Sequence, residues 1–142
     1  MIEIVNRQRR RELDIEHWEM FARRALDKIG VEKDAGATIA FVSDRAMRAL
    51  NKKFRGRAMT TDVLSFPSEQ AEWEKSEGES LGDIVISVER AEAQAAGHEL
   101  DFTGEVAQLI LHGLLHLHGH DHETDDGEMN ALEVSLRRRL GI

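Results

Sequence analysis

The sequence predicts a single α+β domain in which a small mixed β-sheet packs against helices. Short β-rich segments are interspersed with longer segments of helical periodicity along its 142 residues. The composition, 41% hydrophobic and 32% charged, is typical of a soluble globular protein. No repeat, low-complexity segment or shift in composition marks a second domain. We therefore assign residues 1–142 to one domain that is large enough to bury a sizeable core.

Four segments are expected to form strands. Residues 2–5 alternate apolar and charged side chains, and residues 38–42 are β-rich and continuous enough for an interior strand. Residues 60–67 are expected to form a loop that enters a short strand, and residues 81–88 a second strong strand. These two strands should pair as a hairpin across the polar segment 69–80. Because Pro67 has no amide donor, its strand should lie at an edge or end there.

Five segments are expected to form helices, and their apolar residues recur at helical spacing. Capping residues and glycines at their ends predict the limits Asp14 to Gly30, Asp44 to Lys53, Glu89 to Ala96, Asp101 or Thr103 to Gly119, and Gly127 to Leu140. The fourth helix is apolar nearly all round, so we expect protein to enclose it.

The fourth helix carries the most informative motif, HGLLHLHGHDH at residues 112–122. His112 and His116 are four residues apart and therefore lie on one helix face. Gly119 tolerates the positive φ that ends a helix, so the chain can turn back and bring His122 to both rings. Three neutral imidazoles with an open fourth position are the ligand set of a catalytic zinc. We therefore predict a zincin-like helix and turn whose three histidines hold one zinc ion.

The residue after the first histidine separates the classes of hydrolase. Zinc on three imidazoles lowers the pKa of its bound water to about 7, which suits hydrolysis of esters, amides and phosphodiesters. Zinc peptidases with this histidine spacing place a glutamate base directly after the first histidine, where this chain has Gly113. A peptidase remains possible if Glu105 or Glu123 reaches the metal. Otherwise the motif favours a phosphodiester substrate.

The charge distribution points to a local basic surface on an acidic protein. The net charge of −8 argues against a protein coated with cations for nucleic acid, yet residues 45–57 hold six basic residues and no acidic one. This strip is compatible with phosphate binding and equally with a solvated helix face. Within it, the planar guanidinium of Arg55 can bind two phosphate oxygens. The glycine-containing segment 54–57 predicts that Arg55 lies in an exposed loop.

The sequence contains no feature of a membrane or secreted protein. No apolar run approaches the roughly 20 residues of a membrane span, and the N-terminus shows no signal-peptide pattern. Cysteine is absent, which fits a reducing compartment and leaves only nitrogen and oxygen as metal ligands.

Taken together, these motifs resemble the YbeY family, which are bacterial endoribonucleases of rRNA maturation and ribosome quality control. The resemblance covers roughly residue 51 to the end, and it rests on the histidine motif, Arg55 ahead of TDVLSFP at 61–67, LGDI at 81–84, Glu128-Met129 and Leu140-Gly141. It implies one zinc ion on His112, His116 and His122, and an arginine at position 55 that is important for activity. It also implies cytoplasmic cleavage of single-stranded RNA near the 3′ end of small-subunit rRNA, with the ribosome as partner and no DNA substrate.

The chain departs from the family pattern at two positions. Thr60 stands where proline is common, which is expected to loosen the loop, and His120 stands where tyrosine is usual. His120 and His118 become additional candidate ligands, although both are better explained as solvated or supporting groups. Asp121 fits two roles, since it can hold a ligand imidazole by hydrogen bond or cap the turn.

A second class of function remains open. If His120 or Asp121 fills the fourth ligand position, the metal is structural and the chain is a non-catalytic ribosome- or RNA-binding factor. Asp62 is compatible with shaping a cleft and equally with forming a turn. His17 and His98 lie far from the motif in ordinary surface patterns, so we expect no chemical role for them.

Overall fold

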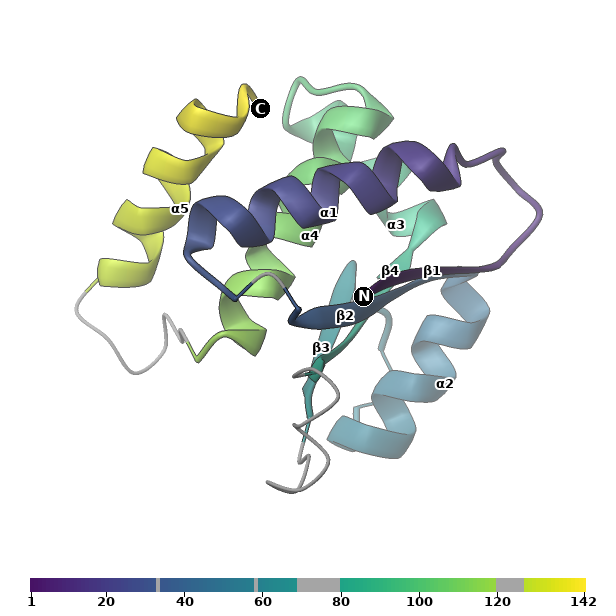
Figure 1. Cartoon of the computed structure of the whole chain (residues 1–142). Helices are drawn as coiled ribbons and strands as arrows, with labels where there is room; N and C mark the ends of the chain where they lie inside the picture. The colour runs from purple at the N-terminus through teal and green to yellow at the C-terminus, as the bar shows by residue number, and fades with distance from the viewer. Residues whose placement is uncertain (33, 58, 69–79, 120–126) are drawn as a thin grey trace.

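A four-stranded mixed sheet with the strand order β1-β2-β4-β3 forms the centre of the molecule (Figure 1). The computed structural model describes residues 1–32, 34–57, 59–68, 80–119 and 127–142. Three strands run parallel, namely β1 (Ile2–Arg7), β2 (Gly36–Val42) and β4 (Ser80–Ser87). The edge strand β3 (Val63–Pro67) pairs antiparallel with β4. The α+β class and the predicted pairing of the last two strands are both confirmed.

The backbones of β3 and β4 approach each other closely where β3 ends, at Pro67 and Gly82. Pro67 is the last residue of β3 and lies opposite Gly82 of β4, so its predicted place at the end of an edge strand is confirmed. Gly82 has a φ of +133°, and a Cβ built there would lie 2.1 Å from the carbonyl oxygen of Phe66. Only glycine fits this position without moving the backbone.

All five predicted helices are present, and local capping explains their limits. They are α1 (Ile15–Ile29), α2 (Asp44–Arg55), α3 (Val88–Gly97), α4 (Phe102–Leu117) and α5 (Glu128–Leu140). The Asp14 carboxylate accepts the His17 amide at 3.1 Å, and Gly30 ends α1 with a φ of 96°. Asp101 accepts the Gly104 amide at 2.7 Å, which places the start of α4 directly after Asp101.

The helices cover both faces of the sheet, with α2 alone on one side and the others on the opposite side (Figure 1). The side chains of neighbouring strand residues alternate between the two faces. On β4, Ile84 packs in the larger core with α1 and α4, whereas Val85 packs against Met47 of α2. On β3, Val63 belongs to the larger core and Leu64 to the α2 side. The edge strand β3 therefore contacts both layers.

Helix α4 lies against β3 and β4 and is enclosed by protein, as its apolar sequence predicts. The closest approach is at Gly113, where an added Cβ would lie 2.9 Å from Cδ1 of Ile84 and 3.1 Å from both of its γ-carbons. A glutamate at this position would have to displace the strand side chain. The position that distinguishes the chain from zinc peptidases is therefore also a packing position.

None of the helices in the described part of the chain has the length and hydrophobicity needed to cross a bilayer.

Replacing Gly113 with alanine tests the packing of α4 on the sheet. The matched control is Gly97→Ala at the last residue of α3, where an added Cβ meets no atom within 4 Å. We expect Gly113→Ala to be less stable than Gly97→Ala by about 1–3 kcal/mol, because its methyl overlaps Ile84. Urea unfolding followed by circular dichroism measures the difference. Equal stability of the two variants would contradict the close contact.

Candidate metal centre

Two of the three predicted metal ligands face each other near the end of α4. The Nε2 atoms of His112 and His116 are 3.1 Å apart, and their ring centroids are 4.6 Å apart. Two nitrogens that bind one tetrahedral zinc at 2.0–2.1 Å lie about 3.3 Å from each other. The pair therefore matches two ligand positions of a single zinc ion, as the spacing of four residues predicts.

Glu133 of α5 orients the first of these rings. The Nδ1–H of His112 donates to one carboxylate oxygen of Glu133 at 2.7 Å, and Arg137 donates to the other at 3.1 Å. Burial raises the pKa of Glu133, which is only 6% exposed, but the hydrogen bond and the charge interactions with His112 and Arg137 outweigh burial and lower that pKa overall. An ionised carboxylate only accepts, so the Nδ1 of His112 carries the proton of this bond, and its Nε2 faces His116.

The turn after α4 agrees with the prediction as far as it is described. Gly119 has a φ of +98°, the left-handed conformation expected to reverse the chain. The predictions for His120, Asp121 and His122 concern residues 120–126, which lie outside the described residues. Within the described part of the chain, no third metal-binding side chain completes a cluster of three. The third ligand therefore remains a prediction from the sequence.

A small pocket of about 190 Å³ opens beside His112, where α4 meets β3, α5 and the end of α3. Its lining residues combine charged, polar and apolar side chains: Asp62, Val63, His98, Glu105, Gln108, Leu109, His112 and Arg137. The Asp62 carboxylate accepts the Val63 amide at 2.9 Å, and the Asp62 carbonyl accepts the Ser87 amide at 2.9 Å. Asp62 therefore lies at a bend before β3, is bonded to β4 and lines the pocket.

His98 has a more specific place than the sequence indicates. Its Nδ1 lies 2.9 and 3.0 Å from the two carboxylate oxygens of Glu105, whose residue is only 2% exposed. Both residues line the pocket beside His112. The spacing of seven residues places Glu105 and His112 on the same face of α4, two turns apart, so the sequence contains a signal that this carboxylate lies near the histidine pair. Since His98 engages both oxygens, Glu105 does not occupy the role of a peptidase base in this arrangement.

Arg55 is exposed, as predicted, but it is the last residue of α2 and not part of a loop. The helix ends at Gly56 with a φ of 69°. Helix α2 covers the opposite face of the sheet from α4, and the contacts of the described residues do not join Arg55 to the histidine pair. The edge strand β3 separates the two sites.

A family model described as "Endoribonuclease YbeY" matches residues 3–141 of the chain. The chain belongs to the YbeY family. An "Endoribonuclease YbeY" of Solibacter usitatus is 43% identical over 126 residues, which cover 87% of this chain and 78% of the relative. Another "Endoribonuclease YbeY", of Geobacillus thermodenitrificans, is 37% identical over 140 residues, which cover 90% of this chain and 87% of the relative.

The fold comparison agrees with the sequence comparison. The solution structure of TM1509 from Thermotoga maritima is similar, with a TM-score of 0.66 and 27% sequence identity. The match covers 99% of this chain and 89% of that chain. The similarity to YbeY relatives, which the motifs place from about residue 51 onward, therefore extends over nearly the whole domain.

The departure from the YbeY pattern at Thr60 is accompanied by a new contact. The Thr60 hydroxyl donates to the Asp44 carboxylate at the start of α2, and the Ser87 hydroxyl donates to the same oxygen at 3.2 Å. A proline at this position has no hydroxyl and makes no such bond. Side-chain hydrogen bonding therefore links the loop to α2, where the sequence alone predicts a looser loop.

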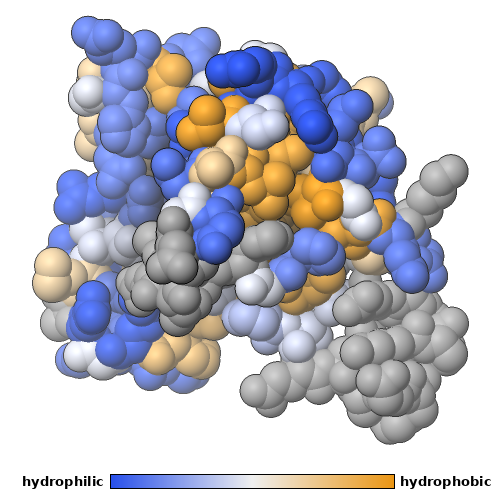
Figure 2. All heavy atoms as spheres, turned by 90° about the vertical axis from the view of Figure 1, so that its left-hand side faces the viewer, coloured by the Kyte–Doolittle hydropathy of each residue, from blue (hydrophilic) through white to orange (hydrophobic). Residues whose placement is uncertain are grey.

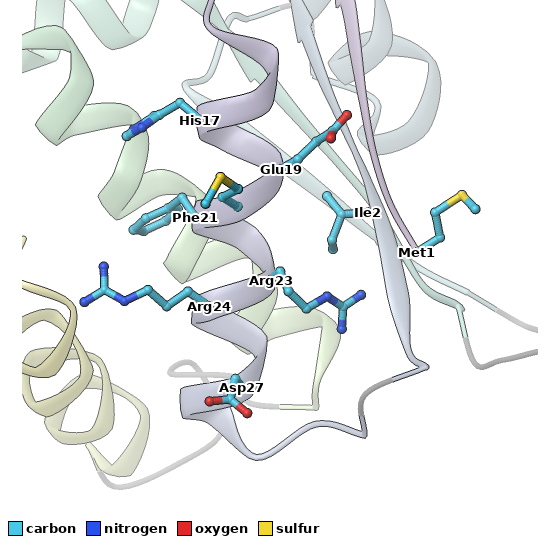
Figure 3. A pocket seen from close by; sticks show the side chains of 9 residues that line it. Met1, Ile2, His17, Glu19, Phe21, Arg23, Arg24 and Asp27 are labelled. Atoms are coloured by element: carbon cyan, nitrogen blue, oxygen red, sulfur yellow. The ribbon is translucent and has the colours of Figure 1, made fainter.

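A larger pocket, of about 920 Å³, lies between α1 and the start of β1 (Figure 3). Its lining is mainly apolar with charges of both signs: Met1, Ile2, His17, Glu19, Met20, Phe21, Arg23, Arg24 and Asp27. A hydrophobic patch surrounded by hydrophilic residues is also visible on the face that carries α5 (Figure 2). Size alone does not identify the site, because the described residues of this larger pocket include no cluster suited to a metal.

The role of Glu133 can be tested without changing a metal ligand. Glu133→Gln keeps the shape of the side chain but removes its charge, so we expect zinc affinity to fall about 10- to 100-fold. Competition with a chromogenic chelator measures this change. The control is Glu92→Gln, which alters a carboxylate that pairs with Arg10 at 2.9 Å. The zinc affinity of this control variant should match that of wild type. Unchanged affinity in Glu133→Gln would show that the hydrogen bond to His112 does not support metal binding.

Proposed function

We propose that this chain is a zinc-dependent endoribonuclease specific for single-stranded RNA. We further propose that it acts in the cytoplasm on the 3′ end of small-subunit rRNA and in ribosome quality control. The observation that carries the proposal is the pair of facing Nε2 atoms on α4, with the His112 ring oriented by Glu133, in a member of the YbeY family.

His112, His116 and His122 would hold one zinc ion per chain. The described residues fit this role because the two α4 nitrogens converge and Glu133 fixes the tautomer of His112. When bound, zinc supplies a Lewis acid and lowers the pKa of its water to about 7. Thiolate ligands are excluded because the chain has no cysteine.

The substrate class follows from the residues around the pair. A peptide bond calls for a glutamate base beside the first histidine, and this chain has Gly113 packed on Ile84 there. A phosphodiester instead requires cations that stabilise the negative charge on its oxygens. Arg55 supplies a planar guanidinium for two phosphate oxygens, from a sequence segment, 45–57, that contains no acidic residue. Since the net charge is −8, RNA affinity depends on this local surface and should fall steeply with added salt.

Zinc content and RNA cleavage, measured together on single-histidine variants, test the proposed ligand set. We expect His122→Ala and His116→Ala to lose stoichiometric zinc and RNA cleavage together, because two imidazoles form a poor site. His118→Ala, a change within the same motif, should keep both. Wild type should leave casein intact, and a chelator should stop RNA cleavage. Full zinc content in His122→Ala would reject the turn-back geometry, and zinc-dependent digestion of casein without RNA cleavage would reject the nuclease.

The phosphate-binding role of Arg55 has its own test. Arg55→Lys keeps the positive charge but loses the planar fork, so we expect the RNA cleavage rate to fall by about 10²-fold. Melting temperature and zinc content should stay at the wild-type values, because Arg55 is exposed. Arg9→Lys, which changes an exposed arginine outside segment 45–57, is the control and should cleave normally. If Arg55→Lys is unfolded or lacks zinc, Arg55 has a structural role instead.

A further inference from the structure

The end of α2 presents an aromatic ring among exposed cations. Phe54 is 55% exposed, and it lies between Lys53 and Arg55 in the exposed segment 52–57. This segment holds four basic residues and no acidic one. We call residues 52–57 together with Phe66 the α2-end surface. Cations at a helix C-terminus are explained by the helix dipole, but the dipole gives no reason for an exposed phenylalanine.

The ring of Phe54 is held in place by its neighbour on β3. The Phe54 and Phe66 ring centroids are 5.2 Å apart with an angle of 65° between the planes, an edge-to-face contact. Phe66 packs in turn against the buried cluster that contains Met47 and Leu64. The ammonium group of Lys53 lies 5.3 Å from the Phe54 centroid. Phe54 is therefore positioned by a partly buried ring while more than half of its own surface remains open to solvent.

The strand β3 connects this surface to the metal centre. Val63 lines the pocket beside His112, and Phe66 contacts Phe54 on the other side of the sheet. These two positions are three residues apart, about 10 Å along a strand. Because β3 is an edge strand, a nucleic acid chain can pass around it without crossing the sheet.

We propose that Phe54 stacks on an unpaired base of single-stranded RNA while Lys53, Arg55 and Arg57 bind the adjacent phosphates. Proteins that bind single strands combine a cationic path with aromatic rings in this way, and stacking accepts any base because each has a π-face. In a duplex the base faces are already stacked on each other, so the ring selects unpaired RNA. This inference rests on the proposed nuclease function and supplies its preference for single strands.

The test separates base stacking from phosphate binding. Zinc-loaded protein is titrated with a fluorescent single-stranded 2′-O-methyl oligonucleotide and with an abasic oligonucleotide of the same length and charge. We expect Phe54→Ala and Phe54→Leu to bind the base-containing strand about tenfold more weakly, and the abasic strand as wild type does. Phe54→Trp should restore binding, and its added fluorescence should be quenched by the bases. Phe54→Leu keeps an apolar side chain, and its melting temperature verifies folding.

Two controls define the surface. Met20→Ala removes an exposed apolar side chain, 66% exposed on α1, and should bind both strands normally. Arg57→Ala should weaken binding of both strands, since it loses a phosphate contact. Wild-type binding of the base-containing strand by Phe54→Ala would overturn the proposal, as would an equal loss on the abasic strand.

Cleavage of unmodified RNA by the same wild-type preparation distinguishes this inference from the function on which it rests. If wild type cleaves RNA and Phe54→Ala binds the base-containing strand as wild type does, the stacking site is rejected and the proposed nuclease function stands. Base-dependent binding through Phe54 without any cleavage by wild type supports the stacking site and rejects the nuclease. If wild type neither binds nor cleaves, both are overturned.

Discussion

The close contact between α4 and β4 at Gly113 and Ile84 is the constraint on which the rest of the site depends. It buries the helix against the sheet, so a polar side chain on that helix needs a partner. Two pairs meet this need, since Glu133 bonds His112 and His98 bonds Glu105. The partners come from α5 and from the end of α3, so the same bonds that satisfy the helix also fix its neighbours.

The histidine pair and the cationic end of α2 lie on opposite faces of the sheet. On the α4 side, Glu133 bonds the Nδ1 of His112, so that Nε2 is the ring nitrogen that faces His116. The six basic residues of segment 45–57 lie along α2 and just beyond it, on the opposite face. A carboxylate that orients a metal ligand and cations that bind phosphate oxygens are both required by the proposed metal-assisted hydrolysis of a phosphodiester. Strand β3 lies between the two regions. Its Val63 side chain lines the pocket beside His112, and its Phe66 side chain contacts Phe54 at the end of α2.

Local signals were sufficient for much of this structure, and contacts between distant residues were not. Asp14 and Asp101 cap their helices as their sequence context predicts, and the spacing of His112 and His116 brings their Nε2 atoms to 3.1 Å. Glu133 lies 21 residues beyond His112 on another helix, and its role depends on how α5 packs on α4. The bond between His98 and Glu105 could not be predicted from the sequence either, because it depends on the packing of α3 on α4. The glycine-containing segment 54–57 predicts a loop at Arg55, whereas Gly56 caps the helix and Arg55 is its last residue.

The central claim is that the histidine motif on α4 and the turn after it form one zinc site that makes the chain an endoribonuclease. The most direct measurement removes all metal with a chelator, adds zinc back stepwise, and follows bound zinc and the initial rate of single-stranded RNA cleavage in the same samples. The account predicts that cleavage is absent without metal, rises in proportion to bound zinc, and saturates at one zinc ion per chain. Full cleavage by the metal-free protein, or stoichiometric zinc binding without any cleavage, would contradict it.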